Sequence, residues 1–324
     1  MKHWLPFLLI FFIYPSLLIA QVDDDWDDRT EEEIAADKAA AAFWDDVYED
    51  ERKGLYVGLY VGALRSGNAT ARMYDGHGFD LDGTRHNFQN SWLNTYLNSI
   101  LSSPAIGGDQ VAQALGVDPG QWTFGPEDMP GQMVYNIAFS FGLQARYNFD
   151  AKNALLFNIN LMRLTTNGLF TVESTATQPQ NPANPGAINF VRPIAEFGIR
   201  GMEQRMGFQV GYQRILGDHE FFNWIVEGGV DLTIVRFDGN EIELGGQIID
   251  ITQVLNTFGQ PLMGARNLTG AGVGVFGGFG GQIEAGGAWT IQLLYNPIFQ
   301  NIALGSVASY GLHHMLGLRM IYNL

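Results

Sequence analysis

Three aspartates lie close together in a glycine-rich stretch, at Asp75, Asp80 and Asp82. Carboxylates are hard oxygen donors of the kind that Ca²⁺ prefers. The spacing does not match an EF-hand loop, and the stretch lacks the glutamate that closes such a loop. Two interpretations therefore stay open, a calcium site at these three residues and an acidic loop rich in turns.

Histidines are scarce, which limits the catalytic chemistry available to the chain. After the first twenty residues they are His77, His86, His219, His313 and His314. No nucleophile motif accompanies any of them, so we do not expect an enzyme. In a strand, the adjacent pair His313-His314 points to opposite faces and cannot jointly hold a metal ion.

The run from Gly272 to Gly277 matches the pattern G-x-G-x-x-G. A dinucleotide site needs that pattern between a parallel strand and a helix, with an acidic residue further on. Those companions are missing, and glycines in a bent strand explain the run better. We therefore expect no cofactor.

The first twenty residues resemble a secretory signal peptide. A basic start at Lys2 is followed by an apolar run, and Ala20 is acceptable before a cut at Gln21. An uncleaved membrane anchor is the alternative. The chain contains no cysteine, so disulfides, lipid-modified cysteines and thiolate metal sites are excluded.

Residues 21–53 form a strongly acidic segment with 14 carboxylates and four basic residues, a net charge of −10. Apolar residues at three- and four-residue spacing predict a helix here. It is either a solvated helix docked by its aromatic stripe or a helix that binds a partner or plugs a barrel. The candidate partner-binding residues are Trp26, Phe43, Trp44 and Tyr48.

After Gly54 the hydrophobic period changes from helical to two, as in β-strands. Only 16% of the residues are charged and 13% are aromatic, whereas soluble chains carry about 25% charged residues. Strands with one large apolar face and low charge fit an all-β transmembrane antiparallel barrel better than a soluble sandwich. The expected strands lie near 55–64, 133–149, 155–161, 191–200, 205–213, 222–234, 242–251, 273–283, 289–295 and 312–324.

These segments predict about ten strands over residues 54–324, with eight or twelve as alternatives, because bacterial barrels have even strand numbers. Short periplasmic turns are expected at 149–153, 201–203 and 284–287. Outside, the sequence predicts long loops at 66–130, 174–186 and 253–270 and a short turn at 216–220. An aromatic stripe predicts a helix at 88–101 within the first loop.

Charged side chains fall on the polar faces of the expected strands, which would line the lumen. They are Arg146, Arg192, Glu196, Arg200, Arg205, Glu227 and Asp231. Charges of both signs could pair and plug a narrow barrel; a selective ion path is the alternative.

With these features together, the chain resembles the small outer-membrane β-barrel proteins of Gram-negative bacteria. The resemblance covers residues 1–20 and 54–324 and includes the final alternation Leu316, Leu318, Met320, Tyr322 and Leu324. It ends in Leu where that family usually has an aromatic residue. The resemblance implies an outer-membrane location, contact with outer-membrane lipid, and recognition of the last strand by the barrel-assembly machinery.

Function is less constrained than fold. A net charge of −16 without a basic patch excludes nucleic-acid binding. The expectation is a non-enzymatic structural or accessory protein that binds a periplasmic or outer-membrane protein through its acidic helix or outer loops. A transport barrel for small solutes or ligands is the alternative, and a barrel hydrolase is a distant third.

Overall fold

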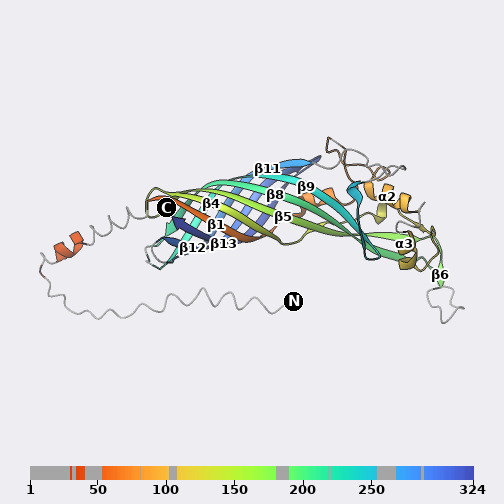
Figure 1. Cartoon of the computed structure of the whole chain (residues 1–324), viewed down its shortest axis with the longest axis horizontal. Coiled ribbons are helices and arrows are strands. Elements are labelled where there is room, and N and C mark those ends of the chain that lie inside the picture. Colours follow the sequence, from red (N-terminus) through yellow and green to blue (C-terminus); the bar gives the residue numbers. More distant parts are fainter. Residues whose placement is uncertain are drawn as a thin grey trace. The chain divides into compact units, whose positions relative to one another are not determined.

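Eight long strands pair edge to edge and close into one antiparallel ring in the computed structural model (Figure 1). The structure describes residues 30, 34–40, 53–80, 82–101, 108–179, 190–217, 219, 221–253, 268–285 and 288–324. The ring runs in chain order through β1 (Gly54–Arg65), β4 (Ala138–Asn148), β5 (Asn153–Ser174), β8 (Ile194–Leu216), β9 (Phe222–Leu244), β11 (Thr269–Glu284), β12 (Trp289–Leu304) and β13 (Val307–Asn323). Pairing of β13 with β1 closes the barrel.

Short connections gather at one end of the barrel. They join β4 to β5, β8 to β9 and β11 to β12, and the start of β1 and the end of β13 lie at the same end. At the opposite end the long loops emerge, together with a two-residue turn at Gly305 and Ser306. Gly305 has φ +57°, a left-handed conformation that glycine adopts without strain. We call the loop-bearing end the outer end.

The number of strands in the ring is eight, the lower alternative to the expected ten. A turn expected at 201–203 does not exist, because β8 runs through it as one strand. Gly201 is needed because the Tyr74 ring packs directly against the β8 backbone there: a Cβ at this position would lie 2.2 Å from the ring. The expected strand at 242–251 divides into the end of β9 and the short β10 (Gln247–Asp250), which form a hairpin.

The turn at 216–220 is also corrected. This connection lies at the same end of the barrel as 149–153, because β8 is a single strand that runs from the outer end to the turn end. The hairpin at Gly305 was missed, since β12 and β13 run on to it from segments expected to stop at 295 and start at 312. The expected first-loop helix is present as α2 (Trp92–Leu101).

The outward face of the ring is apolar over most of its length. Exposed residues alternate with buried ones along every strand, as in the exposed Leu59, Leu143, Val230 and Leu318. Exposed aromatic residues encircle the turn end of the barrel: Tyr147, Tyr212, Trp224, Trp289 and Tyr322. Others, Phe139, Phe299 and Tyr310, lie toward the outer end. An apolar band between aromatic girdles is the surface that a bilayer requires of a barrel.

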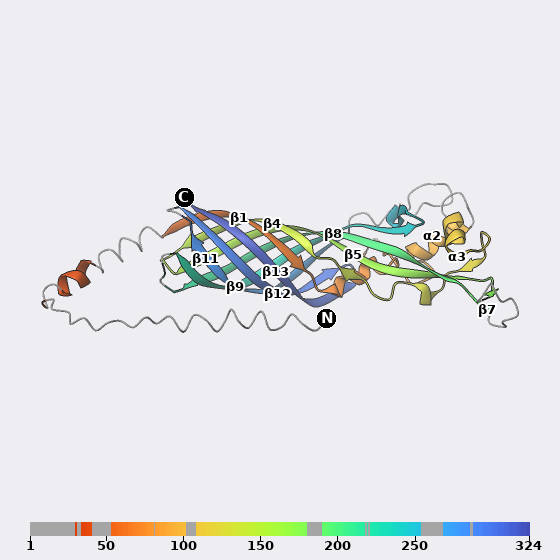
Figure 2. The same cartoon turned by 90° about the horizontal axis from the view of Figure 1, so that it is seen from below.

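Three strands, β5, β8 and β9, continue past this band with 22, 23 and 23 residues, and the loops pack on their inner side (Figures 1 and 2). We call this region the cap. Its small elements are η2 (Asn68–Tyr74), α2, α3 (Gly108–Leu115), β2 (Trp122–Thr123), η4 (Pro126–Asp128), β3 (Val134–Tyr135), β6 (Gln178–Pro179), β7 (Phe190–Val191), β10 and η5 (Ile251–Gln253).

The cap has an ordinary apolar core. Leu93 and Leu97 of α2 and Val111 of α3 are buried with the inward side chains of the extended strands. Tyr74 stacks on Phe237 with ring centroids 5.0 Å apart. The described parts of the loop from β1 to β4 are thus packed on the extended strands through a shared apolar core.

The chain divides into two units, residues 1–48 and 49–324. In the first, residues 34–40 are helical, within the expected acidic helix. The expected signal peptide and residues 21–29, 31–33 and 41–52 of the acidic segment lie outside the described residues. Among the described residues, no helix has the length and apolar character that a membrane crossing needs.

Candidate functional site

The lumen is polar because the inward side of each strand carries the polar half of the alternation. Near the outer end, Arg205 donates from Nε to Glu203 Oε1 at 2.5 Å. Tyr74 and Tyr135 each donate a hydroxyl hydrogen to Glu203 Oε2 at 2.8 Å. Both tyrosines come from the loop between β1 and β4, so this outer cluster ties the cap to the barrel wall.

The rest of the Arg205 guanidinium also contacts that loop. It donates to Ser66 Oγ at 3.0 Å and to Thr70 Oγ1 at 3.3 Å, and it lies 5.3 Å from the centre of the Tyr135 ring. The Arg205 and Glu203 side chains are 1% and 0% exposed. A buried ion pair of this kind is stable only when its remaining donors and acceptors are also bonded, as they are here.

A second cluster lies nearer the turn end. Arg319 binds Glu227 through two parallel hydrogen bonds of 2.6 and 2.8 Å. Asn296 and Gln213 donate to the same carboxylate at 2.7 and 3.1 Å. The Arg319 guanidinium also lies 5.8 Å from the centre of the Tyr60 ring. Strands β1, β8, β9, β12 and β13 thus meet in one inner cluster.

Arg146 extends the inner cluster without contacting a carboxylate directly. It donates to Gln213 Oε1 at 3.1 Å and to Gln282 Oε1 at 3.3 Å. Its guanidinium lies 4.6 Å from the centre of the Tyr56 ring. Gln282 in turn donates to Glu284 at 2.6 Å, which carries the network to the barrel mouth. The Arg146 charge is therefore stabilised by amide oxygens and an aromatic face.

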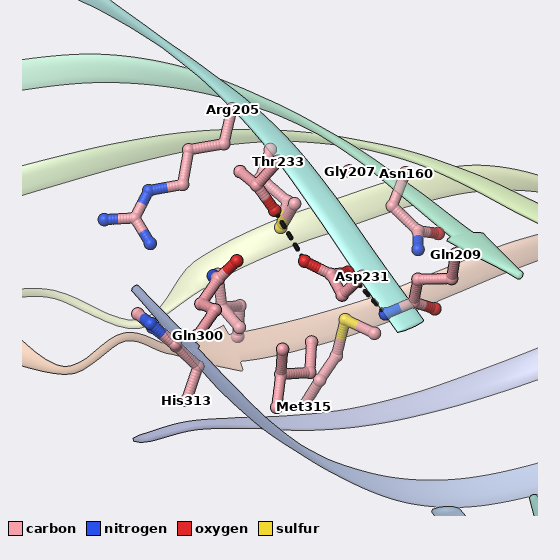
Figure 3. Close-up of a pocket in the computed structure, with 12 residues that line it drawn as sticks. Asn160, Arg205, Gly207, Gln209, Asp231, Thr233, Gln300, His313 and Met315 are labelled. Atoms are coloured by element: carbon pink, nitrogen blue, oxygen red, sulfur yellow. Dashed lines mark hydrogen bonds between the residues drawn. The ribbon is translucent and has the colours of Figure 1, made fainter. Parts of the chain in front are cut away.

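Between the two clusters lies a small cavity, shown in Figure 3. Asp231 projects toward it and accepts hydrogen bonds from Gln209 at 3.0 Å and Thr233 at 2.8 Å. Gln300 and His313 line its other side. Its volume is about 10 Å³, which is about the room that one water molecule occupies. It cannot hold a solute or a metabolite.

The buried charges of the lumen balance. Arg146, Arg205 and Arg319 face Glu203, Glu227 and Asp231, and each of the six is at most 7% exposed. Four of them were among the charges predicted for the lumen. Glu203 was missed because it fell in an expected turn. Arg319 was missed although it alternates with Leu318 and Met320, the signal that could have found it.

Three other predicted lumen charges lie outside the barrel. Glu196 and Arg200 are exposed on β8, and the Arg192 side chain, 58% exposed, lies 3.7 Å from Glu173. Charged side chains face inward only along the part of each strand that carries the apolar outward band. Past the lipid edge, β8 turns its apolar side, including Phe197 and Ile199, toward the cap core and its charged side toward water.

The three aspartates of the calcium hypothesis do not converge on one site in the described part of the chain. Asp75 is bound by Arg85 and by His77, the latter at 2.9 Å, while Asp80 bonds His86 at 2.9 Å. Asp82 instead caps a turn by accepting from the Thr84 backbone at 2.8 Å. Within the described ranges, no three His, Asp or Glu side chains converge as metal ligands do.

Asp75 is the charged anchor of this part of the cap. Burial opposes its charge, but hydrogen bonds from His77 and Arg85 outweigh burial and hold the pKa of the carboxyl below its ordinary value. Asp75 therefore stays ionised under ordinary conditions. It holds the start of the long loop rather than a metal ion.

His313 and His314 point to opposite faces of β13, as adjacent residues of a strand do. His313 faces the lumen, where its Nδ1 lies 2.9 Å from Ser66 Oγ, and His314 faces outward, 2.6 Å from the Tyr295 hydroxyl. The four candidate partner-binding aromatics, Trp26, Phe43, Trp44 and Tyr48, lie outside the described residues. Their role stays a prediction.

Searches of protein-family models and of curated proteins find no match to this chain. Among solved structures, it aligns with the attachment invasion locus protein Ail of Yersinia pestis in complex with a heparin analogue, at 9% identity and a TM-score of 0.33, covering 84% of this chain and 99% of that one. Neisserial surface protein A aligns at 9% identity and 0.35, covering 84% and 97%. The outer membrane protein OprG of Pseudomonas aeruginosa aligns at 11% and 0.32, covering 84% and 94%.

The fold assignment therefore rests on the geometry of the chain itself. Eight antiparallel strands close without a free edge in the ring, and the outward face is apolar between aromatic girdles. This is the architecture of bacterial outer-membrane barrels. The predicted closed antiparallel β-barrel is confirmed, and the final alternation of Leu316, Leu318, Met320, Tyr322 and Leu324 is exposed on its outward face. The location in a Gram-negative outer membrane stays a prediction.

Proposed function

We propose that this protein is a closed, non-enzymatic outer-membrane barrel that anchors its cap at the cell surface, where the cap binds a partner. The observation that carries the proposal is the lumen, which two clusters of buried, hydrogen-bonded charges fill in series. A barrel without a passage acts through its surfaces. Among the described residues, the cap is the larger surface beyond the apolar band.

The interior supports a plug rather than a path. An ion path needs water along its length, whereas Arg205 and Arg319 are 2% and 1% exposed and bonded to carboxylates. Small barrels of about eight strands have interiors that side chains can fill. The transport alternative has no observation of comparable weight, because the cavity between the clusters has room for about one water molecule.

The cap supports a binding role. Loops of this length are usually functional, and here the loop is fixed by a core of its own and by the outer cluster. A rigid surface loses less entropy on association than a mobile loop does. The acidic segment before β1 is a second candidate site for binding a partner.

Single-channel recording in planar bilayers tests the closed lumen. The wild-type protein is expected to give no unitary steps. A variant that removes both ion pairs, E203A/R205A/E227A/R319A, is expected to give steps if it folds, and E196A/R200A, which removes outward charges of the cap, stays silent. Regular steps from the wild-type protein would overturn the closed-barrel proposal.

Crosslinking on whole cells tests the binding role. One variant replaces residues 86–131 with a short Gly-Ser linker, and the other lacks residues 23–53. Loss of crosslinked partners only in the first assigns binding to the cap, and loss only in the second assigns it to the acidic segment. An unchanged partner set in both variants contradicts the binding proposal.

The expectation that the protein is not an enzyme is kept as part of this proposal. Ser66 and His313 form a contact between a hydroxyl and an imidazole, which a hydrolase could use. Here the Gly67 N–H also donates to His313 Nδ1, and Arg205 donates to Ser66 Oγ. Both side chains are buried, and the adjoining cavity is too small for a substrate. Turnover of a phospholipid or peptide that is lost in S66A would contradict it.

A further inference from the structure

The cap presents a sheet surface on the side away from its loops, which we call the cap face. Strands β5, β8, β9 and β10 pair side by side there, and the apolar core lies on their other side. One outward row crosses all four strands in register, through Leu169, Gly198, Glu243 and Ile248. Neighbouring strands are about 4.8 Å apart, so this row spans about 14 Å. The cap face is wide enough for a segment of another protein.

Large aliphatic side chains are exposed on the cap face, although it lies beyond the apolar band of the barrel. Leu169 is 59% exposed, Ile194 is 63% exposed and Ile248 is 66% exposed. A single side chain of this kind is ordinary on a protein surface. Here the three lie around exposed carboxylates on one sheet, which supplies both parts of a protein interface, apolar contacts and charge.

Two carboxylates near the middle of the cap face lack a basic partner within the described residues. Glu196 and Glu243 are exposed on the adjacent strands β8 and β9, and Gly198, the partner of Glu243 in register, is two residues from Glu196. The described ion pair of β8 on this face joins Arg192 to Glu173 instead. Like charges on neighbouring strands repel each other. A basic group bound between Glu196 and Glu243 would remove this repulsion.

The backbone at Gly198 leaves room beside Glu243 for a side chain from a partner. A Cβ at 198 would have Glu243 Cβ and Oε2 as its nearest described neighbours, 3.8 and 3.9 Å away. A lysine side chain laid over Gly198 would place its methylene groups near Leu169 and its ammonium group at the Glu243 carboxylate. Arg200 lies across from Glu241 in the next row, so these two residues add no net charge.

We propose that the cap face binds a protein segment that carries lysine or arginine in its middle and apolar residues on either side. The proposal rests on the binding role of the cap and names the surface and the chemistry of the partner. Charge selects against nucleic acid and lipid phosphate, which Glu196 and Glu243 would repel. A metal ion lacks a ligand set, since no three His, Asp or Glu side chains converge in the described part of the chain.

Fluorescence anisotropy with the full-length protein in neutral detergent tests the cap face. The probe is a labelled synthetic peptide in which lysine and threonine alternate and leucine stands at each end. The same peptide with glutamate in place of lysine is the control ligand and is expected not to bind. The variant E196Q/E243Q is expected to bind the lysine peptide about fivefold to tenfold more weakly, because each exposed ion pair contributes modestly. L169S/I248S changes no charge and is expected to weaken binding severalfold.

The matched control is D118N/E127Q, which removes two exposed carboxylates from the loops of the cap rather than from its sheet. Affinity for the lysine peptide is expected to change less than about twofold, because salt screens distant charges. Absence of wild-type binding, an equal loss in D118N/E127Q, or unchanged binding in L169S/I248S would each overturn the proposal. Displacement of the peptide by Ca²⁺ that requires Glu196 and Glu243 would identify a cation site and overturn it as well.

Whole-cell crosslinking separates this proposal from the general binding role of the cap. The variant E196Q/E243Q is compared with the variant that replaces residues 86–131. Loss of the same partners in both variants supports the cap face. Loss only on replacement of 86–131 overturns the cap face and leaves the binding role of the cap in place.

Discussion

The barrel and the cap are built by opposite rules on the same strands. In the barrel, apolar side chains face out and charges face in, as in Val210 and Gln209. In the cap, Phe197 faces in and Glu196 faces out. Strand β8 passes from one rule to the other without changing which side of the strand faces inward. The medium outside the strand, lipid or water, determines whether its outward side chains are apolar or polar.

Removal of one inward and one outward glutamate from β8 should have very different effects on stability. Glu203→Ala leaves Arg205 buried without a counter-ion and removes the acceptor for two tyrosines, which should cost roughly 3–5 kcal/mol of folding free energy. Glu196→Ala should change it by about 0.5 kcal/mol or less. Urea-induced unfolding in lipid vesicles measures both, and equal costs would contradict the assigned faces.

A second comparison introduces the same charge at two outward positions of β8. Val210→Arg places a guanidinium against lipid and should cost about 2–4 kcal/mol. Ile194→Arg places it on the outer face of the cap, where Ile194 is 63% exposed, and should cost less than about 0.5 kcal/mol. The same vesicle unfolding assay measures them. A large penalty at 194 would mean that the lipid reaches the cap.

The smallest expected effect is the response of the cap to acid. Because the folded-state pKa of Asp75 is lowered, its charge stabilises the cap above the ordinary aspartate pKa of about 3.9 and stops doing so as the pH falls through the lower folded value. Protease resistance of the first loop should therefore decrease below about pH 4, and less so in D75N, which is already weakened at pH 7. An identical acid response in D75N and wild type would contradict this role.

Much of the barrel could be predicted from the sequence because lipid enforces period two on every strand. The short connections from β4 to β5 and from β11 to β12 and the α2 helix were predicted correctly. The errors concentrate where lipid ends. Glu196 and Arg200 were assigned to the lumen because the alternation on β8 continues unchanged into the cap, and local sequence does not reveal which solvent a face meets.

The lumen clusters show a similar limit. Inward polar residues such as Arg146 and Glu227 were identifiable from alternation alone, but their pairing was not. Arg319 meets Glu227 across 92 positions in sequence, and only closure of the ring brings them together. Glu203 was hidden by Gly201, whose role is to admit the Tyr74 ring. Contacts between distant strands are set by register, which a single sequence does not display.

A cysteine scan along the outward face of β8 tests the division between barrel and cap most directly. The native chain contains no cysteine, so only the introduced residue can be labelled. Single cysteines at 196, 198, 200, 204, 206, 208, 210 and 212 are treated with a membrane-impermeant maleimide on intact cells. We expect labelling at 196 to 204 and protection at 206 to 212, with the change between Gln204 and Met206. Labelling throughout 206 to 212, or protection of 196 to 200, would contradict the division between barrel and cap.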